Sequence, residues 1–191
     1  QIVTGKNEFT SYLFSCSSDG TVHKINKSDL SQVSVYSGYN GAIYSIYFGN
    51  DNYLYFGGAD KKIFKLNPND MSKEAEYGFN KVVRDIIQVN DTLYAIGEGE
   101  VHKIDSVNMT ELVKNNPGGA LLSIAYAKGN VYVGNDNSTI FQLDLEKLEA
   151  TSISYSLHSA NVTSLIYAND GYLYSGDANG EIHKIEPSGL T

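Results

Sequence analysis

A motif that recurs five times along this chain of 191 residues limits its fold more than any other feature. Each copy closes on an aliphatic residue, and successive closing residues lie 41, 38, 39 and 42 positions apart: Ile25, Leu66, Ile104, Leu143 and Ile185. Another apolar residue follows five positions later in every copy: Leu30, Met71, Met109, Leu148 and Leu190. The chain is therefore built from five copies of one structural unit.

Each copy is predicted to form short strands joined by tight turns. The first strand is apolar with a small or polar residue inside it, as in Ile43-Tyr44-Ser45-Ile46. Asn, Asp and Gly fill the turns, and these residues tolerate the positive φ that tight hairpins require. A more polar fourth strand is expected at 33–36, 73–77, 112–114 and 152–155. No segment shows sustained helical periodicity.

The second and third strands of each copy are almost continuously apolar or aromatic, which indicates that both faces of each small sheet are covered. Stacked sheets of this kind are typical of a propeller, in which every blade packs against its neighbours. We therefore predict an all-β fold, a β-propeller of five repeats with four-stranded antiparallel blades. It forms a single domain over 1–191, with repeat units at approximately 1–41, 42–80, 81–119, 120–160 and 161–191.

The fifth copy, LHSANVTSLIYANDGYLYSGDANGEIHKI, resembles a WD40 repeat. His158 stands where that family has Gly-His, and Ser175-Gly176-Asp177 begins the position of its Ser-Gly-x-x-Asp-Gly turn. The closing Trp-Asp of the family is absent from all five copies, and an aliphatic residue followed by Asn, Asp or Glu replaces it. That ending is closer to quinoprotein-like and YVTN-type propellers. The resemblance implies a propeller fold and a protein-binding scaffold.

The two ends of the repeat pattern do not match. Ile2-Val3-Thr4 occupies a first-strand position, so the pattern contains five first, second and third strands and only four fourth strands. The last blade is therefore expected to lack its own outer strand, or the chain to be a segment of a larger propeller or multi-subunit assembly. An unpaired outer edge on the fifth blade would favour self-association.

Charge and motifs narrow the function. A net charge of −8 and a pI near 4.9 argue against nucleic acid and membrane as partners. No nucleophile elbow, metalloprotease, P-loop or dinucleotide motif is present, so we expect no enzyme activity and no cofactor. The compartment is left open: Cys16 is the only cysteine, and several Asn-x-Ser/Thr sequons are compatible with secretion.

Three histidines, His23, His102 and His183, share one repeat position, and Phe64 and Phe141 fill it in the other copies. A metal site is the alternative, but equivalent positions on separate blades lie too far apart for a common ion, and the phenylalanines indicate packing. Asp177-Ala178-Asn179-Gly180 resembles the start of a calcium loop but lacks a distant carboxylate. We therefore expect no metal. The lysine that follows the shared position is expected to reach solvent.

Positions that all copies share are explained by the fold, so we expect functional residues at the positions where the copies differ. Asp85 is the one carboxylate at a position that holds Ser or Thr elsewhere, and the preceding Arg84 replaces Tyr44, Leu122 and Thr163. A single structural interaction of Asp85 is the alternative. The approach to the first strand also varies. The predicted protein-binding residues are Tyr39, Tyr44, Phe79, Arg84, Asp85 and His158. A carbohydrate-binding propeller is the alternative, although the chain has no Trp.

Overall fold

The computed structural model describes residues 1–189, so the predicted apolar position at Leu190 lies outside the described residues, as does Thr191. The described part consists of β-strands and one 3-10 turn, η1 (Asn7–Phe9). It contains no helix long and apolar enough to span a membrane. The all-β prediction is thus confirmed.

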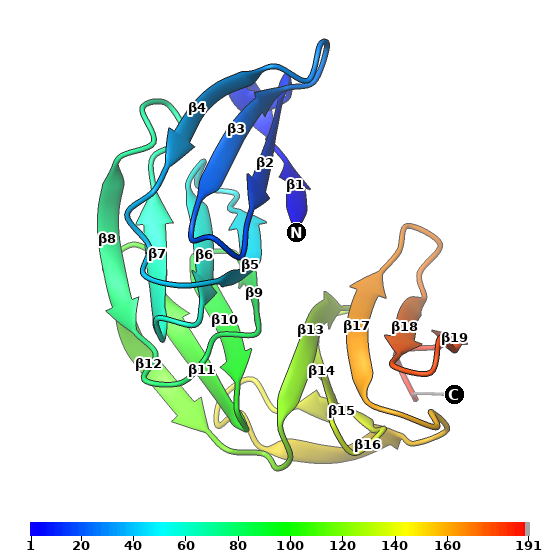
Figure 1. Ribbon diagram of the computed structural model, residues 1–191. Coiled ribbons are helices and arrows are strands. Elements are labelled where there is room, and N and C mark those ends of the chain that lie inside the picture. The colour runs from blue at the N-terminus through cyan, green and yellow to red at the C-terminus, as the bar shows by residue number, and fades with distance from the viewer. Residues whose placement is uncertain (190–191) are drawn as a thin grey trace. The chain divides into compact units, whose positions relative to one another are not determined.

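The strands form five sheets, each corresponding to one sequence repeat (Figure 1). The strands of the first two blades are β1 (Ile2–Thr4), β2 (Tyr12–Cys16), β3 (Val22–Asn26), β4 (Gln32–Tyr36), β5 (Ile43–Phe48), β6 (Leu54–Gly58), β7 (Lys62–Leu66) and β8 (Lys73–Gly78). Those of the third and fourth are β9 (Asp85–Val89), β10 (Thr92–Gly97), β11 (Glu100–Asp105), β12 (Thr110–Asn115), β13 (Leu121–Ala127), β14 (Asn130–Asn135), β15 (Ile140–Leu143) and β16 (Ala150–Tyr155). The fifth has β17 (Val162–Tyr167), β18 (Leu173–Asp177) and β19 (Ile182–Ile185).

Strand order follows chain order in every sheet, which makes each blade a meander of antiparallel neighbours. The first four sheets have four strands, and the fifth has the order β17-β18-β19 in the described part of the chain. Its registers pair Val162 with Asp177 and Leu173 with Ile185. The prediction that the last blade lacks its own outer strand is confirmed for the described residues.

The polar residue after each closing aliphatic residue builds the turn from the third to the fourth strand. The Asn26 side chain accepts a hydrogen bond from Ser28 N at 2.9 Å, and the Asn26 carbonyl accepts one from Leu30 N at 2.9 Å. The apolar residue at the end of this turn has a left-handed φ of 53–59° in all four described copies: Leu30, Met71, Met109 and Leu148. Asn and Asp are favoured here because their side chains cap such turns.

The chain packs as two compact units, residues 1–92 with 105–110, and residues 93–104 with 111–191. Within the first unit, Phe14, Phe48 and Phe56 are buried in a cluster formed where the first blade meets the second. Within the second unit, Tyr132, Val162 and Leu173 are buried in a cluster formed where the fourth blade meets the fifth. Each cluster joins consecutive blades, as expected for sheets that need neighbours to cover their faces.

Candidate binding surface at the bulged first strands

A β-bulge near the start of the first strand directs variable side chains outward. In the second blade, Ile43 pairs with Gly58 and Ser45 pairs with Gly57, which leaves Tyr44 as the extra residue. The register shifts in the same way at Leu122 and Thr163 in the fourth and fifth blades. Because a bulge re-aims the side chain of its extra residue, this position can vary without disturbing the sheet.

Tyr44 and Arg84 occupy this repeat position in consecutive blades of the first unit, and they contact each other. The Arg84 guanidinium lies 5.3 Å from the centre of the Tyr44 ring. Both side chains are exposed, Tyr44 to 44%. The structure therefore brings two of the predicted binding residues together as a cation–π pair on the surface.

Asp85 lies beside this pair and is fixed by hydrogen bonds. Its Oδ1 accepts a hydrogen bond from Ser45 Oγ at 3.0 Å and one from Ile86 N at 2.9 Å. Ser45 Oγ in turn accepts a hydrogen bond from Ile86 N at 3.1 Å. These bonds tie the start of β9 to β5 and hold the Asp85 carboxylate in one place.

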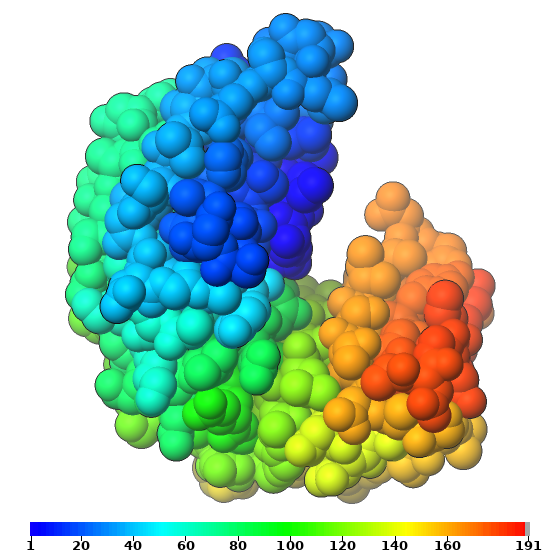
Figure 2. Space-filling view, in the orientation of Figure 1, coloured from blue at the N-terminus to red at the C-terminus, as the bar shows by residue number. Residues whose placement is uncertain are grey.

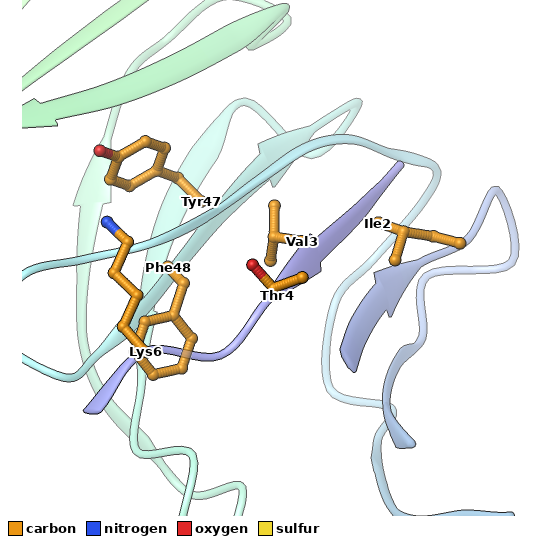
Figure 3. Close-up of a pocket in the computed structure, with 6 residues that line it drawn as sticks. All are labelled: Ile2, Val3, Thr4, Lys6, Tyr47 and Phe48. Atoms are coloured by element: carbon orange, nitrogen blue, oxygen red, sulfur yellow. The ribbon is translucent and has the colours of Figure 1, made fainter. Parts of the chain in front are cut away.

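An open hollow of about 350 Å³ lies along the first strands of the same unit, lined by residues of β1, β5 and the segment after β1 (Figure 3). Lys6 Nζ lies 5.2 Å from the centre of the Tyr47 ring and donates a hydrogen bond to Asn50 Oδ1 at 3.0 Å. Burial lowers the pKa of Lys6 and raises that of Tyr47, whose hydroxyl donates to Gln88 O at 3.3 Å. Lys6 and Tyr47 thus form a second pair of a cation and an aromatic ring, besides Arg84 and Tyr44.

The other three predicted binding residues, Tyr39, Phe79 and His158, are buried at 5%, 0% and 6% exposure. Tyr39 packs edge-on against Phe64, and its hydroxyl donates to Lys62 O at 3.3 Å; burial raises its pKa. The expectation that these three form an exposed contact surface is corrected, because the side chains that precede β5, β9 and β17 at these positions are buried.

His158 is held in a polar network inside the fifth blade. Its Nε2 lies 2.6 Å from Ser175 Oγ, its Nδ1 lies 3.4 Å from Asp177 Oδ2, and its ring stacks on His183. Burial alone would raise the pKa of Asp177, but hydrogen bonds from the backbone N–H groups of Glu181 and Asn179 and from His158 lower it to about 2. The network joins the segment before β17 to the β18–β19 turn.

His158, Glu181 and His183 form a group in the described residues with spacing suited to a metal ion. The two imidazole rings are stacked, with centroids 4.1 Å apart and an interplanar angle of 21°. Imidazole binds a metal through a lone pair in the ring plane, so two parallel stacked rings do not direct their nitrogens at one point. His183 Nδ1 also lies 2.5 Å from the Tyr155 hydroxyl. The geometry favours a polar packing role for these histidines.

The lysine on the third strand does not reach solvent in the first two blades, which corrects that expectation. Lys24 and Lys65 are buried, at 6% and 8% exposure. Lys24 Nζ donates to Pro68 O at 2.8 Å and lies 4.3 Å from the centre of the Tyr12 ring. These two ammonium groups therefore lie between neighbouring blades and not in solvent, where the sequence predicted them.

The hollow formed by Lys6 and Tyr47 has no signal in the sequence. Lys6 lies between strands, and Tyr47 resembles any strand aromatic; only the approach of two neighbouring blades brings them together. The Tyr44–Arg84 pair, in contrast, follows from comparing the repeats, because both residues occupy a position where the copies differ in size, charge and polarity.

Comparisons with known proteins identify the class of fold. No family model and no curated protein matches the chain. Among solved structures, a chain from the crystal structure of the mitotic checkpoint complex superposes with a TM-score of 0.80 at 15% sequence identity. The match covers 91% of this chain and 58% of that one, so this chain spans well under two thirds of its structural neighbour. The likeness shows that this protein has a β-propeller fold.

Proposed function

We propose that this chain is a non-enzymatic β-propeller scaffold that binds a protein partner through the surface around Tyr44, Arg84 and Asp85. The observation that carries the proposal is the cation–π contact of Arg84 with Tyr44 on an exposed, bulged position. Tyrosine and arginine are enriched among the residues that dominate binding energy at protein interfaces. The neighbouring Asp85 is held in place, which lowers the entropic cost of using it in recognition.

The same surface indicates the chemistry of the partner. A guanidinium over a tyrosine ring offers donors for a carboxylate and a flat apolar face for an aromatic or aliphatic side chain. The Lys6–Tyr47 pair in the hollow offers the same combination. A segment with acidic and apolar side chains suits this surface. The neighbouring structure comes from a protein complex, which is compatible with a protein partner.

The test is affinity capture from the source cell with the immobilised chain, followed by quantitative mass spectrometry. The double substitution Tyr44→Ala with Arg84→Ala is expected to reduce recovery of a specific protein at least about tenfold. Tyr126→Ala is the matched control, because Tyr126 is an exposed tyrosine on the first strand of another blade, at 38% exposure. Equal capture by the double variant and the wild type would contradict the proposal.

A glycan array with the same variants tests the alternative of a carbohydrate ligand. Binding to a glycan that the double variant loses, without capture of any protein, would replace the protein scaffold by a carbohydrate-binding propeller. The unfolding midpoints of the variants serve as the control for folding. They are expected to match that of the wild type, because both substituted side chains lie on the surface.

A further inference from the structure

The chain contains two Asn-Gly dipeptides, Asn40-Gly41 and Asn179-Gly180. In such a pair the backbone nitrogen of the glycine can attack the side-chain carbonyl carbon of the asparagine, because glycine has no side chain to keep the two groups apart. The nucleophile and its target belong to adjacent residues, so the reaction needs no partner other than water. Both asparagines are exposed. Whether either pair reacts then depends on how the fold holds its side-chain amide and its glycine N–H.

The fold requires a glycine at position 41. Gly41 has a φ of 120°, a backbone conformation that residues with a side chain rarely adopt. A Cβ on Gly41 would also lie 3.2 Å from the Cβ of Ala59 and 3.9 Å from Asp60 N. The backbone that leads into β5 thus places a glycine directly after Asn40.

The chain on either side of this first pair is anchored to the second blade. Tyr39, just before it, is buried, and its hydroxyl donates a hydrogen bond to Lys62 O at 3.3 Å. Ala42 O, just after it, accepts a hydrogen bond from Ala59 N at 2.8 Å. The segment that contains Asn40 is therefore held at both ends while the blade stays folded.

Between these anchors the reactive groups of the pair have no hydrogen-bond partners. No described residue forms a hydrogen bond with the Asn40 side chain or with the Gly41 N–H. Both residues are exposed, and Figure 2 shows blue and cyan atoms of the segment from β4 to β5 at the surface. The side-chain amide and the Gly41 nitrogen can therefore approach each other without breaking a hydrogen bond of the folded blade.

The second pair, in contrast, is held by the turn between β18 and β19. Asn179 Nδ2 donates a hydrogen bond to Ser159 Oγ at 3.0 Å, and Asn179 N donates one to Asp177 Oδ1 at 3.0 Å. Gly180 N, which would be the nucleophile, donates to Asp177 O at 3.2 Å. The turn must open before this pair can react, which lowers the fraction of molecules that are able to do so. The two pairs thus provide a matched comparison within one chain.

We propose that Asn40 is a site of spontaneous covalent modification, at which the folded chain converts the side-chain amide into a carboxylate through a succinimide. Gly41 N loses its proton and attacks Asn40 Cγ, so that the N–Cγ bond forms, the Cγ–Nδ2 bond breaks and the proton leaves with the amide nitrogen as ammonia. Water then opens the succinimide ring. Attack of water at Cγ gives aspartate, and attack at the backbone carbonyl carbon of residue 40 gives isoaspartate.

Both products change the segment that leads into β5. Each adds a negative charge to the stretch 30–50, which has no charged residue. Isoaspartate also lengthens the backbone between the anchored residues Tyr39 and Ala42, and this disturbs the packing of the buried Tyr39 ring. The isoaspartate form is therefore expected to unfold at a lower temperature than the unmodified chain, whereas the aspartate form should unfold close to it because the side chain at position 40 is exposed.

Peptide mapping of the purified chain over time tests the proposal. The folded protein is incubated in mildly alkaline buffer well below its unfolding midpoint, and mass spectrometry with electron-transfer fragmentation measures aspartate and isoaspartate at each asparagine. Asn40 is expected to react at least about tenfold faster than Asn179, because two hydrogen bonds hold the reacting groups of the second pair. In urea, where neither pair is held by the fold, the two rates should become similar.

Two matched variants assign the reaction to its site. Asn40→Gln should remove the early modification, because glutamine does not form a succinimide, and Asn179→Gln should leave it unchanged. Enzymatic methylation of isoaspartate counts the product in each variant independently of the peptide map, and circular dichroism shows that both variants are folded. Equal rates at Asn40 and Asn179 in the folded chain overturn the proposal. A reaction at Asn40 that takes place in urea but not in the folded chain also overturns it.

Discussion

His158 and His183 stack nearly parallel, with ring centroids 4.1 Å apart, although one lies before β17 and the other within β19. Tyr155 packs edge-on against both rings, with centroids 5.9 Å from His158 and 5.6 Å from His183. The stack therefore connects the segment that enters the fifth blade to its last described strand and to the end of the fourth blade. The residues that looked most suited to chemistry in the sequence serve to hold this blade in place.

Replacing His158 tests this structural role. His158→Ala removes a buried ring that contacts Ser175, Asp177 and His183, and it leaves the buried Ser175 hydroxyl without its hydrogen bond to the ring, so it is expected to destabilise the protein by about 2–4 kcal/mol. Urea unfolding followed by fluorescence of the tyrosines measures the change. His23→Ala, at a half-buried position on the first blade, is the control and should cost under about 1 kcal/mol. Similar losses for the two variants would argue against a special role for His158.

Acid stability should depend on Asp177. Its pKa is lowered from 3.8 to about 2 in the folded chain, so the folded state favours the carboxylate more than the unfolded state does. The resulting stabilisation is complete above the unfolded pKa and is lost as the pH falls from about 4 to about 2. Unfolding free energies measured between pH 7 and pH 2 should therefore fall more steeply for the wild type than for Asp177→Asn. Parallel curves would contradict the assignment.

His102 should make the protein less stable at mildly acidic pH. Burial lowers the pKa of this ring, which is 1% exposed, despite the opposing effects of Glu100 and Glu111. The folded state then binds a proton on His102 less readily than the unfolded state does. The free energy of unfolding is therefore unaffected by this ring above about pH 6.5 and declines as the pH falls below that value. His102→Phe, which copies Phe64 and Phe141 at the same repeat position, should remove this decline. Thermal unfolding at pH 7.5 and pH 5 measures it, and an unchanged pH dependence would count against it.

The sequence repeats predicted the fold closely because propeller blades are local structures. The alternation of turn residues and apolar segments defines each strand, and the register also predicted that the fifth sheet has three strands in the described part of the chain. What the repeats did not reveal is where a side chain lies relative to the next blade. The residues at the positions of Tyr39 and Phe79 vary between copies, which suggested a surface, yet both of these side chains are buried.

The proposed binding surface was predictable only in part for the same reason. Arg84 contacts Tyr44, and Asp85 is hydrogen-bonded to Ser45, because consecutive blades place the same repeat position side by side. The burial of the third-strand lysines was not predicted. Their ammonium groups donate to a backbone carbonyl of the following blade, and the sequence of a single copy does not show that contact. Lys65 is buried for that reason, and Lys184, with the same neighbours in its own blade, is exposed.

This pair of lysines gives the most direct measure of what contact with the next blade contributes. Lys65→Met leaves the Ser106 carbonyl without its ammonium donor and is expected to cost about 1–3 kcal/mol. Lys184→Met removes an ammonium group with the same aspartate and tyrosine neighbours but an exposed position, and in dilute solution should change stability by less than about 0.5 kcal/mol. Urea unfolding at low protein concentration compares them. Equal losses would mean that the aspartate and the rings, and not the carbonyl of the following blade, account for the effect of the lysine.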